Sequence, residues 1–432
     1  MKTKKLVPAL LSSVLLFIVF LSGCQDKVYE KVTYTANVPV YMSFEEFRGS
    51  VKKEPARQLN SPGKIYFKDN LLYINETGAG IHVIDNTNPS SPNVIAFIQV
   101  PGNYDMAIRG NILFADSHID LVAIDITDPN NPVEVDRLQN AFPNVLPPMD
   151  IALPISELDF TKGVVVGWEV KEHTETIERG SSHNKDFVQF DGMGIPRFAS
   201  QELSFNSSGG TGISGSMARF TIFDDYMYTV HNNALKLFNI SNIPGIAAST
   251  SISLDRVVET IFPYDNKLFL GTTTGMLVYG LSNPANPVYI SAFDHINSCD
   301  PVAVQGNYAY VTLRSGNNCF GFTNQLDVVD ISSITNPFLV KTYPLYNPHG
   351  LGIDDNVLFI CDGDAGLKVY DATDPMNIHL HQLAHFPGIK TYDVIPLGGV
   401  LMLIGADGLY QYDYTDLNNL VLLSSITVTR KQ

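Results

Sequence analysis

Basic residues are scarce in this chain: 28 Lys and Arg stand against 44 Asp and Glu in 432 residues, a formal charge of −16. A field of that sign repels phosphate backbones, so the composition argues against nucleic acid as a partner. Charged residues make up only 17% of the chain and apolar residues 45%, which excludes an intrinsically disordered protein. Four cysteines are too few for a small disulfide-dense fold.

The motifs of several enzyme classes are also absent from the sequence. It contains no Gly-x-Ser-x-Gly elbow, no P-loop, no dinucleotide fingerprint and no His-Glu-x-x-His. Trp168 is the single tryptophan, so Trp-containing repeats of the sialidase type and a Trp platform for carbohydrate stacking are missing. Whether the protein is an enzyme stays open at this point, and a non-catalytic role is the better interpretation.

The first residues, by contrast, contain a clear targeting pattern. Lys2, Lys4 and Lys5 precede an apolar run that ends in Leu21-Ser22-Gly23-Cys24. The run is shorter than the roughly 20 apolar residues of a membrane-spanning helix, and it ends in small residues as a secretory cleavage site does. The last four residues resemble a bacterial lipobox, which implies a signal peptide over 1–23, lipidation of Cys24, and an exported protein at the outer membrane or cell surface.

Three regions follow this signal. Residues 24–59 are mixed and polar and read as a tether, within which Val38 to Phe44 alternates as a strand does and pairs with the body of the protein. Residues 60–432 form the main domain. An irregular insertion, expected at about 171–216, carries the flexible run from Ser207 to Gly212 and is interpreted as a solvated loop that contacts other proteins.

An internal repeat determines the fold of the main domain. Each copy is an apolar strand that ends in Asp and is followed by an Asx-Pro turn. The clearest copies are Ile81 to Asp85 with Asn88-Pro89, Leu121 to Asp125 with Asp128-Pro129, Leu326 to Asp330 with Asn336-Pro337, and Leu367 to Asp371 with Asp374-Pro375.

Each repeat unit contains four strands. Two alternating strands joined by a tight polar turn, as in Val302 to Val311, precede the repeated strand, and another short strand follows the Asx-Pro turn. Four antiparallel strands in about 40 to 50 residues, repeated around an axis, are typical of a β-propeller, whose closure protects the sheet edges. The sequence therefore predicts an all-β protein.

These repeats resemble the LVIVD repeat, a short β-propeller motif named for its apolar strand and terminal Asp. The resemblance covers roughly residues 60 to 432, and the segments Tyr34 to Phe47 and Cys299 to Asp330 are similar to those of LVIVD lipoproteins of Bacteroidetes-type bacteria. The resemblance implies the propeller fold and the exported compartment, but it assigns no chemistry.

One position in each unit, at the start of its first strand, forms a column of mostly charged residues. The column contains Gly63, Asp105, Asp150, Arg219, Glu259, Asp300, His349 and Asp393. Eight members predict eight blades; seven is the alternative, because the unit after Asp150 loses its regular turn. The first strands of propeller blades commonly lie nearest the axis, so these side chains are expected at the mouth of the central channel.

Two interpretations of this column are open. The side chains, Gly63 apart, form a site for a polar ligand, a glycan or a cation such as Ca²⁺, or each Asp accepts hydrogen bonds from strand-end amides in a purely structural role. A calcium loop at Asp362 to Gly366 is only weakly indicated, and a glycine-rich hairpin turn is the better interpretation there. No cofactor is required.

The cysteines beyond Cys24 suggest one covalent link. Cys299 precedes the first strand of the sixth unit and Cys319 follows its second strand, so antiparallel pairing brings them to the same end of the blade. We predict a disulfide between them. Cys361 ends an apolar strand and is expected to be a buried thiol without a catalytic role.

The sequence thus favours an exported, lipid-anchored propeller that is a non-catalytic ligand-binding or protein-interaction scaffold at the cell envelope, with the membrane and an envelope protein or glycan as partners. A second hypothesis is a polysaccharide hydrolase or lyase that uses Asp105, Asp300, His349 and Asp393 as acid and base groups. A third is a propeller whose channel holds a structural cation.

Overall fold

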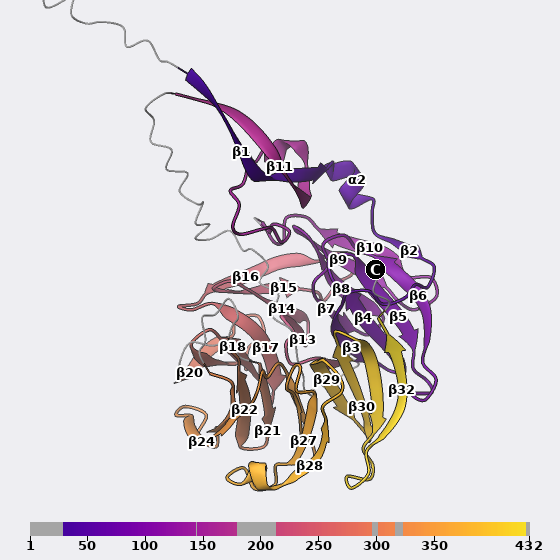
Figure 1. Cartoon of the computed structure of the whole chain (residues 1–432), viewed down its shortest axis with the longest axis vertical. Coiled ribbons are helices and arrows are strands. Elements are labelled where there is room, and N and C mark those ends of the chain that lie inside the picture. The colour runs from indigo at the N-terminus through magenta and orange to yellow at the C-terminus, as the bar shows by residue number, and fades with distance from the viewer. Residues whose placement is uncertain (1–28, 144, 179–212, 296–300, 316–322, 429–432) are drawn as a thin grey trace, which may run out of the picture. The chain divides into compact units, whose positions relative to one another are not determined.

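A computed structural model describes residues 29–143, 145–178, 213–295, 301–315 and 323–428. The chain divides into two units, one made of residues 1–39, 149–158 and 168–189 and the other of the remainder. The larger unit contains seven antiparallel sheets among the described residues, each built on four consecutive strands. It is a seven-bladed β-propeller, so the main prediction of eight blades is wrong and the alternative of seven holds (Figure 1).

Blades 1 to 4 follow one another along the chain. Their strands are β3 (Pro62–Lys68), β4 (Leu71–Glu76), β5 (Gly80–Asp85) and β6 (Asn93–Gln99); β7 (Met106–Arg109), β8 (Ile112–Ser117), β9 (Asp120–Asp125) and β10 (Val133–Leu138); β13 (Phe220–Phe223), β14 (Tyr226–His231), β15 (Ala234–Asn239) and β16 (Ala247–Ser253); β17 (Val258–Tyr264), β18 (Lys267–Thr272), β19 (Gly275–Gly280) and β20 (Val288–Asp294).

Blades 5 to 7 complete the ring. Their strands are β21 (Val302–Gln305), β22 (Tyr308–Leu313), β23 (Gln325–Asp330) and β24 (Phe338–Pro344); β25 (Leu351–Asp354), β26 (Val357–Cys361), β27 (Leu367–Asp371) and β28 (Gln382–Phe386); β29 (Thr391–Leu397), β30 (Val400–Gly405), β31 (Gly408–Asp413) and β32 (Val421–Thr427). A 3-10 turn, η2 (Ile378–Leu380), precedes β28.

Two further strands extend blade 1. β2 (Lys52–Glu54) pairs with the outer strand β6, so part of the segment expected to be a tether belongs to the propeller sheet. β12 (Ile213–Ser214) pairs with the inner strand β3, although about 150 residues separate the two in sequence. Blade 1 is therefore a six-stranded sheet.

Four further elements among the described residues lie outside the seven blade sheets. β1 (Tyr29–Met42) pairs with β11 (Val164–Glu178), and α2 (Phe44–Arg48) and the 3-10 turn η1 (Phe160–Lys162) complete the secondary structure. The strand expected at 38–44 is thus longer and ends at Met42. Residues 171–178, expected as the start of an irregular insertion, belong to β11, because β1 supplies them with a hydrogen-bonding partner strand.

The Asp that ends each repeated strand has a structural role. The side chains of Asp85, Asp125 and Asp371 each accept a hydrogen bond from the backbone N–H two residues later, at 2.8 to 2.9 Å. This Asx turn starts the connection to the fourth strand. Hydrogen bonds from the following threonine lower the pKa of each of the three carboxyls, which therefore stay ionised at neutral pH.

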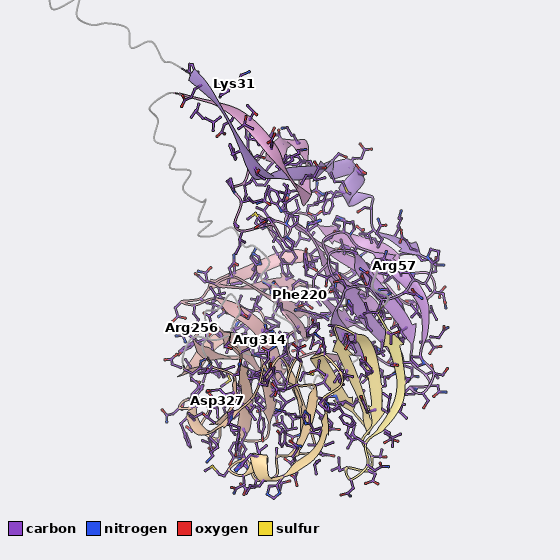
Figure 2. The ribbon with its side chains drawn as sticks, viewed as in Figure 1. Lys31, Arg57, Phe220, Arg256, Arg314 and Asp327 are labelled. Atoms are coloured by element: carbon purple, nitrogen blue, oxygen red, sulfur yellow. The ribbon has the colours of Figure 1, made fainter. Side chains whose placement is uncertain are left out.

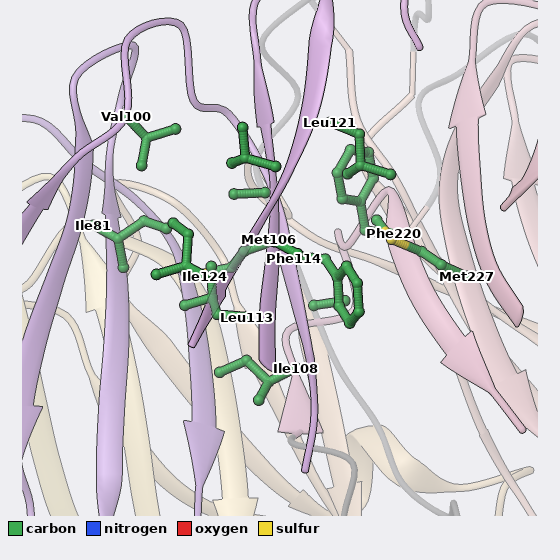
Figure 3. Packing of buried hydrophobic residues seen from close by; sticks show 14 of the residues in the cluster. Ile81, Val100, Met106, Ile108, Leu113, Phe114, Leu121, Ile124, Phe220 and Met227 are labelled. Atoms are coloured by element: carbon green, nitrogen blue, oxygen red, sulfur yellow. The ribbon is translucent and has the colours of Figure 1, made fainter. Parts of the chain in front are cut away.

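Alternation along the strands builds the core between neighbouring blades. Between blades 2 and 3, for example, Met106 and Phe114 belong to the same buried cluster as Phe220 and Met227, and Figure 3 shows these side chains between the two sheets. Every blade contributes to such clusters, and the first strands of successive blades contact one another. The first strands therefore lie innermost, as the sequence predicted.

The last blade packs against the first and closes the ring (Figure 1). Ile65 and Ile74 of blade 1 share a buried cluster with Met402 and Ile404 of blade 7. The buried Gln411 donates a hydrogen bond of 2.7 Å to Asn86 Oδ1 and accepts one of 2.9 Å from Asn86 Nδ2. Side chains rather than an exchanged strand therefore join the two ends of the propeller.

Candidate functional site

The propeller places five of the predicted site residues as the sequence analysis expected, at the starts of first strands. Asp105, Arg219, Glu259, His349 and Asp393 lie at or just before β7, β13, β17, β25 and β29. Asp300 lies outside the described residues. The five described residues form two groups, one around Lys64 and one around Arg314.

Asp150 is not a member of this ring, which corrects its assignment to the column. It is exposed and belongs to the smaller unit, where its backbone carbonyl accepts a hydrogen bond from Asn37 Nδ2 at 2.8 Å. Its carboxylate accepts a hydrogen bond from the backbone N–H of Ala152. The reason is that no hairpin turn or repeated strand follows Asp150, so no blade can form there.

The first group is centred on an ion pair between blades 1 and 2. Lys64 Nζ lies 2.5 Å from Asp105 Oδ2, and the two side chains are 12% and 4% exposed. The same Asp105 oxygen accepts a hydrogen bond of 2.6 Å from the backbone N–H of Arg219, at the start of blade 3. Its other oxygen accepts a hydrogen bond from Met106 N. Asp105 therefore joins three blades.

Asp116 belongs to the same group, and the sequence analysis did not select it as a site residue. Its Oδ1 accepts hydrogen bonds from Asn103 Nδ2 and from the backbone N–H groups of Tyr104 and Asp105, at 2.8 to 2.9 Å. Burial raises the pKa of the Asp116 carboxyl to about 7, although these hydrogen bonds oppose the shift. Asp116 is therefore partly protonated at neutral pH.

Asp393 lies under a covering segment of backbone. It is fully buried, and burial raises its pKa well above the ordinary value for an aspartate. Gly215, directly after β12, covers it: a Cβ on Gly215 would overlap Asp393 Oδ2. Only glycine permits so close an approach, which makes the segment from Ile213 to Ala218 a strap across the inner end of blade 1.

The second group joins blades 4, 5 and 6. Arg314 Nη1 lies 2.7 Å from His349 Nδ1, and Glu259 supplies a negative charge that acts on Arg314. Burial, and then the charge of Arg314, lower the pKa of His349 to about 3, so this imidazole is neutral at physiological pH. The positive charges that act on the carboxylates of the two groups are those of Lys64, Arg219 and Arg314.

A small cavity lies beside the first group, between blades 2 and 3. Its volume is about 30 Å³. Asp105, Asp116, His118, Arg219 and His231 form its polar wall. Its apolar wall comprises Phe142, Val145, Phe220 and Val230. Phe220 is labelled in Figure 2, and its ring stacks on that of Phe142 with the ring centres 5.7 Å apart.

Several residues of these groups have no local sequence signal. Lys64 is adjacent to Gly63 of the column. Because side chains alternate along a strand, its position next to the apolar Ile65 could have indicated that Lys64 faces the site. Arg314 and Asp116 lie at hairpin ends, outside the column of first-strand residues from which the candidate site was predicted. The strap at Gly215 comes from a distant part of the chain, and nothing nearby in sequence predicts its contact with Asp393.

The remaining predictions have different outcomes. Cys24, Cys299 and Cys319 lie outside the described residues, so the lipidation and the disulfide stay predictions. Cys361 is buried at the end of β26. Within the described ranges, no cluster of three acidic, histidine or cysteine side chains could hold a metal ion. The same part of the chain contains no helix long and apolar enough to cross a membrane.

The loop at Asp362 is a turn held by protein groups. The Asp362 carboxylate accepts hydrogen bonds from the backbone N–H groups of Tyr346 and Asn347, and it pairs with Lys368 Nζ at 2.6 Å. Gly363 and Gly366 both have positive φ, as a tight turn requires. The segment is therefore a glycine-rich hairpin turn, as the sequence favoured.

Several solved structures align with most of this chain. The periplasmic gluconolactonase of Pseudomonas aeruginosa aligns with a TM-score of 0.52 at 11% identity, covering 85% of this chain and 97% of that one. The computationally designed Ika8 protein aligns with a TM-score of 0.49 at 11% identity, over 88% and 92%. BamB from Moraxella catarrhalis gives 0.46 at 6%, over 89% and 97%. At such identities the likeness concerns the fold alone.

Sequence comparison identifies the repeat. No curated protein has a significant sequence match to this chain. Three segments, residues 63–100, 101–139 and 298–344, match the LVIVD repeat. They correspond to blade 1, blade 2 and the region of blade 5. The chain is therefore a seven-bladed β-propeller that contains LVIVD repeats.

Proposed function

We propose that this protein is a non-catalytic binding scaffold that a lipid on Cys24 holds at the cell envelope. The lipobox-like residues before Cys24 support the anchor. Closed propellers present many loops on a rigid frame, a form suited to binding. The acidic balance of the chain supports a protein or glycan partner over nucleic acid.

The observation that carries the proposal is the bonding of Asp105. A general acid or base must reach the reacting atoms of a substrate, but both Asp105 oxygens are committed to Lys64, Arg219 N and Met106 N. Asp393, a second candidate base, is fully buried beneath Gly215. Asp105 joins blades, which is what a scaffold requires.

Membrane fractionation tests the anchor. The Cys24→Ala protein, with its signal peptide otherwise unchanged, is expected in the soluble exported fraction after a high-salt wash, whereas the wild type stays with the membrane. Multiply acylated anchors hold a protein firmly, so the difference should be nearly complete. A Cys299→Ala protein is the matched control and should remain membrane-bound. Membrane retention of the exported Cys24→Ala protein would contradict the proposal.

Asp116 keeps the hydrolase or lyase hypothesis open to a direct test. Its pKa of about 7 is suited to a general acid, and its side chain lines the cavity between blades 2 and 3. That cavity, at about 30 Å³, has room for roughly two waters and not for a sugar ring. We expect no turnover of oligosaccharides; turnover by the wild type that Asp116→Asn abolishes would favour the enzyme instead.

A further inference from the structure

The cavity between blades 2 and 3 has both polar and apolar lining residues. Arg219 and Asp116 are among the polar ones, and Phe142, Val145 and Phe220 are among the apolar ones. Such an arrangement, with a few oriented polar groups against apolar side chains, is typical of a site for a small organic molecule. The cavity lies wholly within the propeller.

The charges of the polar lining residues favour an anion. The negative charge of Asp105 is balanced by Lys64, whose Nζ lies 2.5 Å away. The guanidinium of Arg219 has no ion-pair partner among the residues that the structure describes, where its side chain bonds only through Nη2, to Val230 O at 3.1 Å and His231 Nδ1 at 3.4 Å. Nε and Nη1 of Arg219 are thus available to a carboxylate, which a guanidinium binds through two parallel hydrogen bonds.

A second polar group lines the same cavity. The His118 side chain is 4% exposed, and its Nδ1 lacks a hydrogen-bond partner within the described part of the chain. A buried polar atom left without a partner costs free energy, so a bound molecule that supplies one is favoured. Burial lowers the pKa of His118 to about 4, which leaves a neutral ring able to donate from one nitrogen.

Volume limits the size of the ligand. A cavity of about 30 Å³ holds roughly two waters, which together occupy about 60 Å³ of liquid. Formate and acetate are of this size, whereas a sugar or a nucleotide is much larger. The apolar wall distinguishes acetate from inorganic anions, because a methyl group against Phe142 and Val145 gains contact that a sulfate oxygen does not.

We propose that the cavity between blades 2 and 3 is a binding site for a small monocarboxylate of the acetate class, held by Arg219 and His118. The inference deepens the proposed function, since it gives the scaffold a ligand, but it does not depend on the lipid anchor. A soluble fragment that begins after Cys24 binds equally well.

Binding of a carboxylate at this site depends on pH through Asp116. Protonated Asp116 donates a hydrogen bond to the anion, whereas ionised Asp116 repels it. The histidines that line the cavity, His118 and His231, have pKa values of about 4 and 3 and stay neutral between pH 6 and 8. The other charged groups at or beside the cavity are Arg219, Asp105 and Lys64. Given a pKa of about 7 for Asp116, affinity should fall about tenfold from pH 6 to pH 8.

Calorimetric titration with sodium acetate, against sodium chloride at matched ionic strength, tests the proposal on the soluble protein. We expect saturable binding of one acetate, about tenfold tighter at pH 6 than at pH 8. Arg219→Gln should abolish it, while Arg256→Gln, the same change on a residue paired with Asp255 and Asp294, should leave it unchanged. Asp116→Asn should keep binding and remove its pH dependence.

Three results would overturn the proposal: no saturable acetate binding, equal affinity for acetate and sulfate, or undiminished binding by Arg219→Gln. If Arg219→Gln does not fold, Val145→Phe replaces it, because a larger side chain fills the apolar wall and should exclude acetate. None of these results bears on membrane attachment, which the Cys24→Ala experiment measures. Failure of the ligand site and failure of the scaffold proposal are therefore distinguishable.

Discussion

Replacing Asp105 by Asn should destabilise the propeller more than any change of a single surface charge. The substitution leaves the Lys64 ammonium buried without its counter-charge; its acceptors are then Met217 O, at 2.8 Å, and at most the neutral amide oxygen of the new asparagine. Breaking a buried ion pair from one side typically costs about 3–5 kcal/mol. Because the Lys64 side chain is 12% exposed and retains some contact with water, we expect the lower end, about 3 kcal/mol.

Urea unfolding of the soluble protein measures this effect. With an m-value of about 3 kcal/mol/M, the midpoint should fall by about 1 M. Asp225→Asn is the control: it removes the same charge from a pair with Arg109, but the Asp225 side chain is 61% exposed, so the loss should be below about 1 kcal/mol.

A double variant separates the ion pair from the other bonds of Asp105. Lys64→Met combined with Asp105→Asn removes both charges, and neutral packing should recover most of the loss. The reasoning is refuted if Asp105→Asn costs no more than Asp225→Asn. It is also refuted if the double variant is as unstable as the sum of its two single variants, because the ammonium would then not be the source of the cost.

Two further predictions concern the strap and the second polar group. Gly215→Ala should destabilise the propeller by about 1–3 kcal/mol in urea unfolding, because its Cβ would overlap Asp393. The control is Gly167→Ala, where a Cβ meets no atom within 4 Å and the loss of stability should stay under about 0.5 kcal/mol. Equal losses of stability in the two variants would refute the close packing of the strap on Asp393. His349→Gln should reduce the loss of stability on acidification. The pKa of this imidazole is about 3 in the folded protein and about 6.5 in the unfolded chain, so on acidification the unfolded chain takes up the proton first. The stability of the wild type therefore falls as the pH drops from 6.5 toward 3. Parallel pH profiles of stability for the wild type and His349→Gln would contradict this.

The sequence predicted the repeated part of the fold because periodic signals are local. Alternating strands, polar hairpin turns and the Asp before each Asx-Pro turn lie within a few residues of the contacts they make. The predicted number of eight blades was wrong because the third unit contains only part of the repeat. Asp150 occupies the column position, but no repeated strand and Asx-Pro turn follow it, and a blade cannot bury its faces without its second hairpin.

The candidate site was predictable only in part, since its contacts cross between blades. The column located Asp105, Arg219 and Asp393 near the axis. It did not reveal that Lys64 neutralises Asp105 or that Gly215 covers Asp393, because these contacts join residues 41 and 178 positions apart. Such distances carry no periodic signal in one sequence.

The pairing of Gln411 with Asn86 has a consequence for synthesis of the protein. These two side chains lie 325 positions apart and close the ring between blade 7 and blade 1. Until the last blade has emerged, the chain is an open arc whose two end sheets expose apolar faces, including Ile65 and Ile74 on one of them. A nascent chain of this design is thus most exposed to misassembly just before its final forty or so residues arrive, since ends separated by a long sequence join slowly.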